Sequence, residues 1–67
     1  MKKTKKVMEL LLDDGRQFIV IRDYNGDAYK DHALYYRWYN NGWHKRKILV
    51  CGNVYEAMQY LVDHKYN

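Results

Sequence analysis

Two dipeptides, Asp14-Gly15 and Asn41-Gly42, constrain the fold of this 67-residue chain more than any other feature. Each stands between two runs that are rich in apolar, β-branched and aromatic residues. Such dipeptides supply the positive φ angles of a two-residue hairpin turn, because glycine, asparagine and aspartate tolerate the left-handed backbone. The sequence therefore predicts two β-hairpins. Their strands are expected at Lys6 to Leu12, Arg16 to Arg22, 33–40 and 43–50.

These turns predict which residues face each other across the strands. In the first hairpin the expected pairs are Leu12 with Gln17, Leu10 with Ile19 and Met8 with Ile21. In the second hairpin they are Trp38 with Lys45, Tyr36 with Lys47 and Leu34 with Leu49 on one face, and Tyr39 with His44, Arg37 with Arg46 and Tyr35 with Ile48 on the other. A helix over residues 4–13 is the competing interpretation of the first run, because Met, Glu and Leu are good helix formers and Thr4 could cap it.

A helical pattern follows the second hairpin. Asn53 is a good N-cap, and apolar residues recur at helical spacing from Val54 to about His64. The expected fold is therefore α+β, an antiparallel β-meander of two hairpins and four strands with one C-terminal helix packed on the sheet. We expect a flexible basic arm at residues 1–6, a single small domain at 7–67, and a loop from Asp23 to His32 between the hairpins.

The residue inventory argues against an enzyme. A chain of this length has room for one core, it contains no serine, and Thr4 is its only threonine, so Ser-based catalytic arrangements are excluded. No glycine motif for phosphate binding is present, and Cys51 and the histidines lack the spacing of a zinc site. We expect a non-enzymatic protein with no cofactor, no metal and no membrane partner. A single cysteine fits the reducing cytoplasm.

Charge is segregated along the chain, whose formal net charge is +4. No carboxylate occurs between Asp31 and Glu56, and this stretch carries four Lys and Arg residues among aromatic ones. In the predicted register Arg37 and Arg46 oppose each other, which destabilises a sheet by up to about 1 kcal/mol unless an anion such as a phosphate lies between them. The alternative without a binding role is that both guanidiniums point into solvent and the tyrosines pack under the helix. The candidate nucleic-acid-binding residues are Tyr35, Arg37, Trp38, Tyr39, Trp43, His44, Lys45, Arg46 and Lys47.

Residues 35–64 resemble a known class of DNA-binding module. The segments that carry the likeness are Tyr35 to Tyr39, Asn41-Gly42, His44 to Lys47 and Asn53 to Ala57. They are similar to the three-stranded modules of the AP2-like and phage-integrase arm-binding class, in which aromatic and basic strands precede a helix that opens with a Glu-Ala pair. The resemblance implies that the sheet contacts DNA through Arg37, Trp38, Lys45 and Arg46. The order of four strands and a helix also looks like that of single-strand-binding coactivator-type proteins.

The leading hypothesis is a small protein that binds DNA or RNA, with cations of the 33–50 hairpin on phosphates and its rings stacked on bases. The alternative is a protein-interaction module, such as an inhibitor or accessory factor, that presents the same hairpin to an acidic protein surface. A homodimer is a further expectation, because Met8, Met58, Tyr60 and Leu61 could form an exposed apolar patch.

Overall fold

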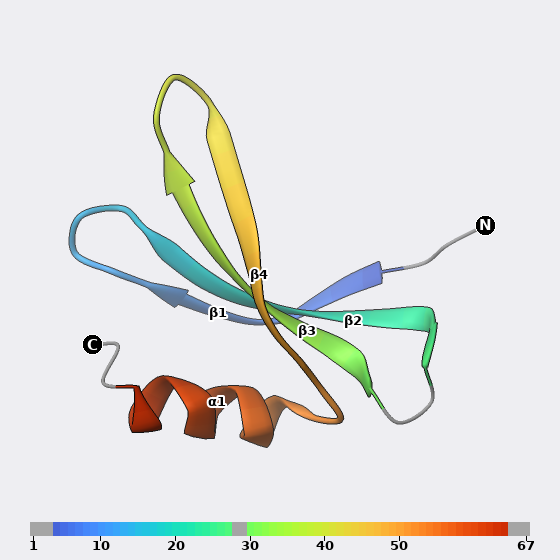
Figure 1. Ribbon diagram of the computed structural model, residues 1–67. Helices are drawn as coiled ribbons and strands as arrows, with labels where there is room; N and C mark the ends of the chain where they lie inside the picture. The colour runs from blue at the N-terminus through green and yellow to red at the C-terminus, as the bar shows by residue number, and fades with distance from the viewer. Residues whose placement is uncertain (1–3, 28–29, 65–67) are drawn as a thin grey trace.

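The computed structural model describes residues 4–27 and 30–64, with side chains left out of the description at 24–27. It contains a four-stranded antiparallel sheet in the order β1-β2-β3-β4 and one helix (Figure 1). The elements are β1 (Thr4–Leu11), β2 (Gln17–Asp27), β3 (Lys30–Tyr39), β4 (Trp43–Cys51) and α1 (Val54–Asp63). The predicted α+β meander with a C-terminal helix is confirmed.

The first run forms a strand, so the helix considered for residues 4–13 is wrong. In this strand Met8 packs against the core and Glu9 is exposed, because successive side chains of a strand point to opposite faces. Thr4 to Lys6, expected in the basic arm, pair with Asp23 to Ile21 in the sheet. Residues 1–3 of that arm lie outside the described residues.

The loop expected from Asp23 to His32 is also largely replaced by strand. β2 continues to Asp27 and β3 begins at Lys30, with Asp27 and Lys30 opposite each other. The pairing shifts between Arg22 and Asp27, so the extension is irregular. Residues 28 and 29 of the expected loop lie outside the described part of the chain.

Both hairpins differ from the predicted register by one residue because their turns are longer than two residues. In the first, Leu12 N–H donates to the Arg16 carbonyl at 2.8 Å, which places Asp13, Asp14 and Gly15 in the loop. Gly15 has a φ of +91°, and a three-residue loop places its glycine in this left-handed region. The partner of Gln17 is consequently Leu11 rather than Leu12.

The second turn holds Asn40, Asn41 and Gly42, with φ values of 55° at Asn41 and 132° at Gly42. Tyr39 therefore faces Trp43, and the whole hairpin end is shifted from the predicted pairs. The register shifts again between Leu34 and Tyr35, where β4 carries an extra residue, so that Leu34 does face Leu49 as predicted.

The shifted register overturns the opposed pair of arginines. Arg37 faces Lys45, and Arg46 faces Tyr36. The predicted opposition of Arg37 and Arg46, and with it the need for an anion between them, is therefore wrong. Arg37 and Lys45 still place two positive charges opposite each other.

The core lies between the sheet and α1. Its buried side chains are Phe18, Val20, Leu34, Cys51, Ala57 and Leu61. Asn53 caps α1 as predicted, because its side-chain oxygen accepts a hydrogen bond from Glu56 N–H at 2.9 Å. Of the expected apolar patch, Leu61 is buried in this core, Met8 and Tyr60 pack partly against it, and Met58 is exposed.

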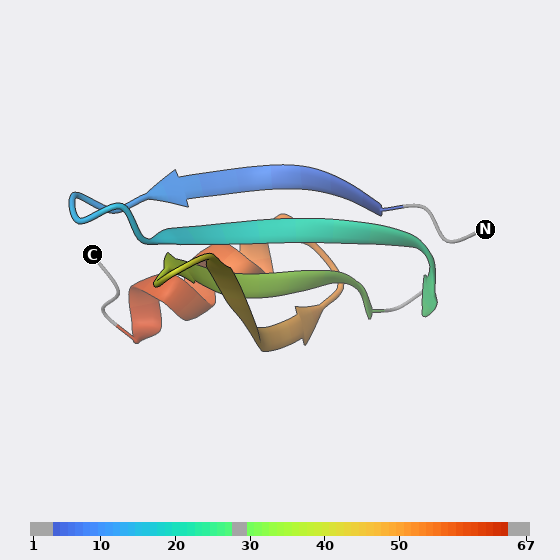
Figure 2. The ribbon, with the colours of Figure 1, turned by 90° about the horizontal axis from the view of Figure 1, so that it is seen from above.

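The helix covers only part of the sheet. Figure 1 shows α1 below the sheet, while the turn end of the β3–β4 hairpin extends away from it. Figure 2, turned by 90°, looks at the molecule from above, with α1 behind the strands. The face of β3 and β4 that points away from α1 is thus not covered by any other described element.

Candidate nucleic-acid interface

The β3–β4 hairpin sorts its side chains onto two faces. Leu34 and Tyr36 pack in or against the core on the α1 side. Because side chains alternate along a strand, the odd-numbered residues from Tyr35 to Tyr39 on β3 lie on the other face. Their partners on β4 lie on that face too. This basic-aromatic surface consists of Tyr35, Arg37, Tyr39, Trp43, Lys45 and Lys47. Six of the nine predicted site residues are thereby brought together.

Cations and rings alternate across the basic-aromatic surface. The guanidinium carbon of Arg37 lies 4.7 Å from the ring centroid of Trp43. The Nζ atoms of Lys45 and Lys47 lie 4.9 and 5.8 Å from the ring centroid of Tyr35. Each such contact contributes about 0.5–1 kcal/mol at an exposed site. The three cations are thus held near rings, with Lys45 and Lys47 exposed and Arg37 half-buried.

Two rings at the turn end are open to solvent. The side chain of Tyr39 is 68 % exposed and that of Trp43 is 51 % exposed. Their ring centroids are 5.7 Å apart with an interplanar angle of 73°, so the edge of one ring meets the face of the other. The exposed faces of these rings are available for a ligand to stack on.

The charge of this surface is not neutralised within the part of the chain that the structure describes. There, carboxylates form ion pairs with Lys6, Arg16, Arg22 and His32. The cations of the β3–β4 hairpin take part in none of these ion pairs, and Arg37 donates to the amide oxygen of Gln17 at 3.2 Å instead. This follows from the sequence, which has no carboxylate in β4 or in the turn before it.

Three predicted site residues, Trp38, His44 and Arg46, lie on the α1 side of the hairpin instead. The ring of Trp38 is stacked between those of Tyr36 and His44, with centroid distances of 5.4 and 5.5 Å. Phe18 continues this aromatic row into the core, 5.3 Å from Tyr36. The row comprises Phe18, Tyr36, Trp38 and His44.

A groove lies beside the aromatic row. It has a volume of about 450 Å³ and is lined by Asp14, Gly15, Arg16, Tyr36, Trp38 and Tyr39. Its two walls come from the β1–β2 turn and from the end of β3. Sequence reasoning missed Asp14, Arg16 and Tyr36 as site residues, because no local pattern shows that the two turns lie at the same end of the sheet.

Arg16 is held firmly at this groove. Its Nε atom lies 2.6 Å from Asp14 Oδ2, and its Nη1 donates to the hydroxyl of Tyr36 at 3.2 Å. The hydrogen bond from Arg16 lowers the pKa of Asp14, and the bonds to Asp14 and Tyr36 raise the pKa of Arg16. Both groups are therefore charged at neutral pH.

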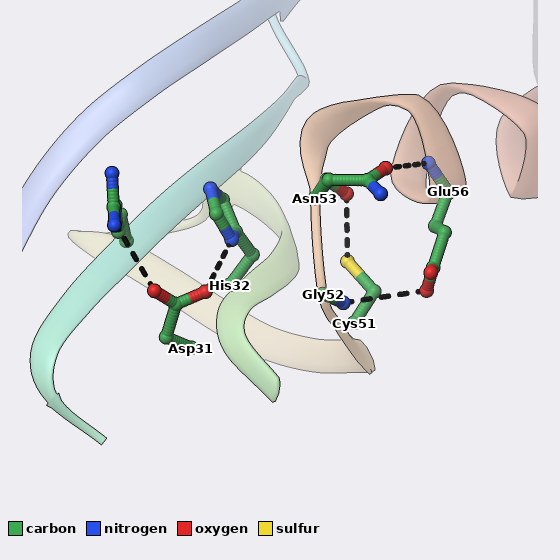
Figure 3. Close-up of polar contacts among 7 residues, drawn as sticks. Asp31, His32, Cys51, Gly52, Asn53 and Glu56 are labelled. Carbon is green, nitrogen blue, oxygen red and sulfur yellow. Dashed lines mark hydrogen bonds and ion pairs between the residues drawn. The ribbon is translucent and has the colours of Figure 1, made fainter. Parts of the chain in front are cut away.

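A second polar cluster lies at the other end of the sheet (Figure 3). His32 Nδ1 is 2.6 Å from Asp31 Oδ1, and Arg22 Nε donates to Asp31 Oδ2 at 3.1 Å. Partial desolvation raises the pKa of Asp31, but the hydrogen bonds from His32 and Arg22 outweigh it and lower the pKa overall. The carboxylate of Asp31 on β3 is thus hydrogen-bonded to Arg22 on β2.

Cys51 faces His32 across the strands, but it lacks the properties of a nucleophile. Its side chain is buried, and its Sγ donates to the carbonyl of Asn53 at 3.3 Å (Figure 3). Burial raises the pKa of the Cys51 thiol. Because the thiolate is the reactive form, this cysteine serves packing at the start of α1.

Comparisons with protein-family models, curated proteins and solved structures gave no match. The resemblance of residues 35–64 to AP2-like and integrase arm-binding modules therefore stays a prediction. Within residues 4–27 and 30–64, no three His, Cys, Asp or Glu side chains gather as a metal site would require. The described part of the chain also has no helix with the length and apolar character needed to span a membrane.

Proposed function

We propose that this chain is a small non-enzymatic protein that binds single-stranded DNA or RNA through its basic-aromatic surface. The observation that carries the proposal is the alternation of three cations with three rings on one uncovered face, with no ion pair to neutralise the cations in the described structure. Single-strand-binding proteins use this combination, with cations along the backbone and rings under the bases.

Each residue type has a distinct part in this proposal. Arg37, Lys45 and Lys47 contact phosphates, which supplies affinity that does not depend on sequence. Tyr39 and Trp43 carry the most exposed rings and stack on bases, each worth about 1–3 kcal/mol. The bases of a duplex are already stacked on each other, so the rings favour unpaired strands.

The test is fluorescence anisotropy with labelled single-stranded DNA, RNA and duplex DNA over a series of salt concentrations. We expect the wild type to bind single strands more tightly than duplex, with affinity that falls as salt rises. Trp43→Ala/Lys45→Ala should weaken single-strand binding at least about tenfold, because it removes one ring and one cation from the surface.

The matched control is Tyr55→Ala/Met58→Ala, which removes two exposed apolar side chains from α1. It should keep wild-type affinity, and circular dichroism should show that both variants are folded. If no polymer binds at low salt, the proposal is wrong. The same hairpin would then be tested against an acidic protein surface, the alternative that its Trp, Tyr and Arg content also fits.

A further inference from the structure

We infer that the groove between the β1–β2 turn and the end of β3 binds one unpaired guanine base. The inference deepens the proposed function and rests on it, since the base would belong to a strand that lies on the basic-aromatic surface. It adds what that surface cannot supply, which is a preference for one base over the others.

The groove has the form of a base site. Its volume of about 450 Å³ is within the usual range of small-ligand pockets, and three of its six lining residues are aromatic. Trp38 is fixed on the sheet by stacking on Tyr36 and His44, so its ring is already oriented before a ligand arrives. A base entering the groove would meet rigid rings on one wall and the polar β1–β2 turn on the other.

Arg16 supplies the means to read the base. A guanidinium has five N–H donors, and the contacts with Asp14 and the Tyr36 hydroxyl engage two of its nitrogens, Nε and Nη1. Among the described residues, Nη2 keeps both of its donors, and Nη1 keeps one. These remaining donors belong to a side chain that lines the groove and that Asp14 and Tyr36 hold in place.

Hydrogen-bond chemistry selects guanine. Guanine presents two adjacent acceptors, O6 and N7, which suit a pair of guanidinium donors. Adenine presents an amino donor where guanine has O6, so a fixed arginine would face a donor there. An unpaired cytosine also has two adjacent acceptors, N3 and O2, but a pyrimidine offers less ring surface than a purine to the aromatic wall of the groove.

The groove is continuous with the basic-aromatic surface through Tyr39, which belongs to both. The β1–β2 turn, which lines the groove, lies at the same end of the sheet as the turn of the β3–β4 hairpin (Figure 1). Tyr36 and Trp38 lie on the α1 side, so a single strand on the basic-aromatic surface would reach the groove by passing Tyr39 at the end of the hairpin.

The test is titration of a Trp43→Phe variant, in which Trp38 is the only indole, with GMP, AMP, CMP and UMP. All four carry the same phosphate, so differences among them report the base. We expect saturable quenching of Trp38 fluorescence, with a Kd for GMP at least about tenfold below that for AMP, the discrimination expected of one bidentate arginine contact.

The decisive variant is Arg16→Lys in the same background. Lysine keeps the charge but loses the planar pair of donors, so the preference for GMP over AMP should disappear. The inference is overturned if GMP and AMP quench equally, if quenching is not saturable, or if Arg16→Lys keeps the preference.

A parallel titration of the wild type with oligothymidylate separates this inference from the proposed function. Binding of oligothymidylate without a GMP preference would refute the guanine site and leave the proposed function standing. A GMP preference without oligothymidylate binding would support the guanine site and count against the basic-aromatic surface.

Discussion

Lys45 and Lys47 lie on the same face of β4, each near the ring of Tyr35, and neither pairs with a carboxylate in the described structure. If they contact phosphates, replacing both by glutamine removes two of the three cations of the basic-aromatic surface and leaves Arg37. The side chains remain polar and of similar length, so the change acts chiefly on charge. The salt dependence of binding then reports how many contacts are lost.

The size of the effect follows from counter-ion release. Each neutralised phosphate on a single strand contributes about −0.7 to the slope of log K against log salt, so three cations give about −2.1 and one gives about −0.7. Between about 50 and 200 mM salt, the wild type should lose affinity about 18-fold and Lys45→Gln/Lys47→Gln about threefold.

Fluorescence anisotropy with labelled oligothymidylate at four or more salt concentrations measures both slopes. The matched control is Lys5→Gln/Lys30→Gln, which removes two exposed lysines from β1 and from the far end of β3. The control should keep the wild-type slope. Equal slopes for the wild type and the Lys45/Lys47 variant would show that these lysines contact no phosphate. An equal loss of slope in the control would show that the charge of the whole protein, and not this surface, governs binding.

Three further predictions concern the fold. Leu34→Ala should lower the free energy of unfolding in urea by about 2–5 kcal/mol, because Leu34 is fully buried between the sheet and α1; a loss below about 1 kcal/mol would contradict this packing. Hydrogen bonds from His32 and Arg22 outweigh desolvation and lower the pKa of Asp31 below 3.8. The ionised carboxylate therefore stabilises the fold above pH 3.8, and this stabilisation is lost as pH falls through the lowered pKa. Asp31→Asn should therefore reduce the fall of Tm in acid. An unchanged dependence of Tm on pH would refute the stabilising role of the Asp31 carboxylate. Cys51 should react with a thiol reagent at pH 7 only when urea unfolds the chain, and rapid labelling of the folded protein would show that the thiol is accessible.

The order of elements follows from the sequence because its signals are local. Asn53 and the helical spacing after it determine where α1 begins, and the two glycine dipeptides place the turns. The strand in β1 is less local, since Met, Glu and Leu also favour a helix and pairing with β2 decides the outcome.

The pairing across each hairpin could not be predicted, because a glycine dipeptide gives the position of a turn but not its length. Inclusion of Asn40 in the second turn shifts the pairing by one residue, and a shift of one residue exchanges the faces of a strand. Trp43 and Lys45 thereby join Arg37 on the uncovered face, whereas Arg46 lies on the α1 side. The groove at Arg16 is lined by the β1–β2 turn and the end of β3, which are distant in sequence, so no local pattern predicts it.

The most direct test of the account is a ¹⁵N NMR titration of the wild-type protein with a short single-stranded oligonucleotide. We predict that the largest chemical-shift changes fall on β3 and β4 at the basic-aromatic surface, including the indole N–H of Trp43. The amides of Tyr55, Met58 and Val62 on the exposed side of α1 should stay unchanged. Changes concentrated on α1, or no changes at any residue at low salt, would contradict it.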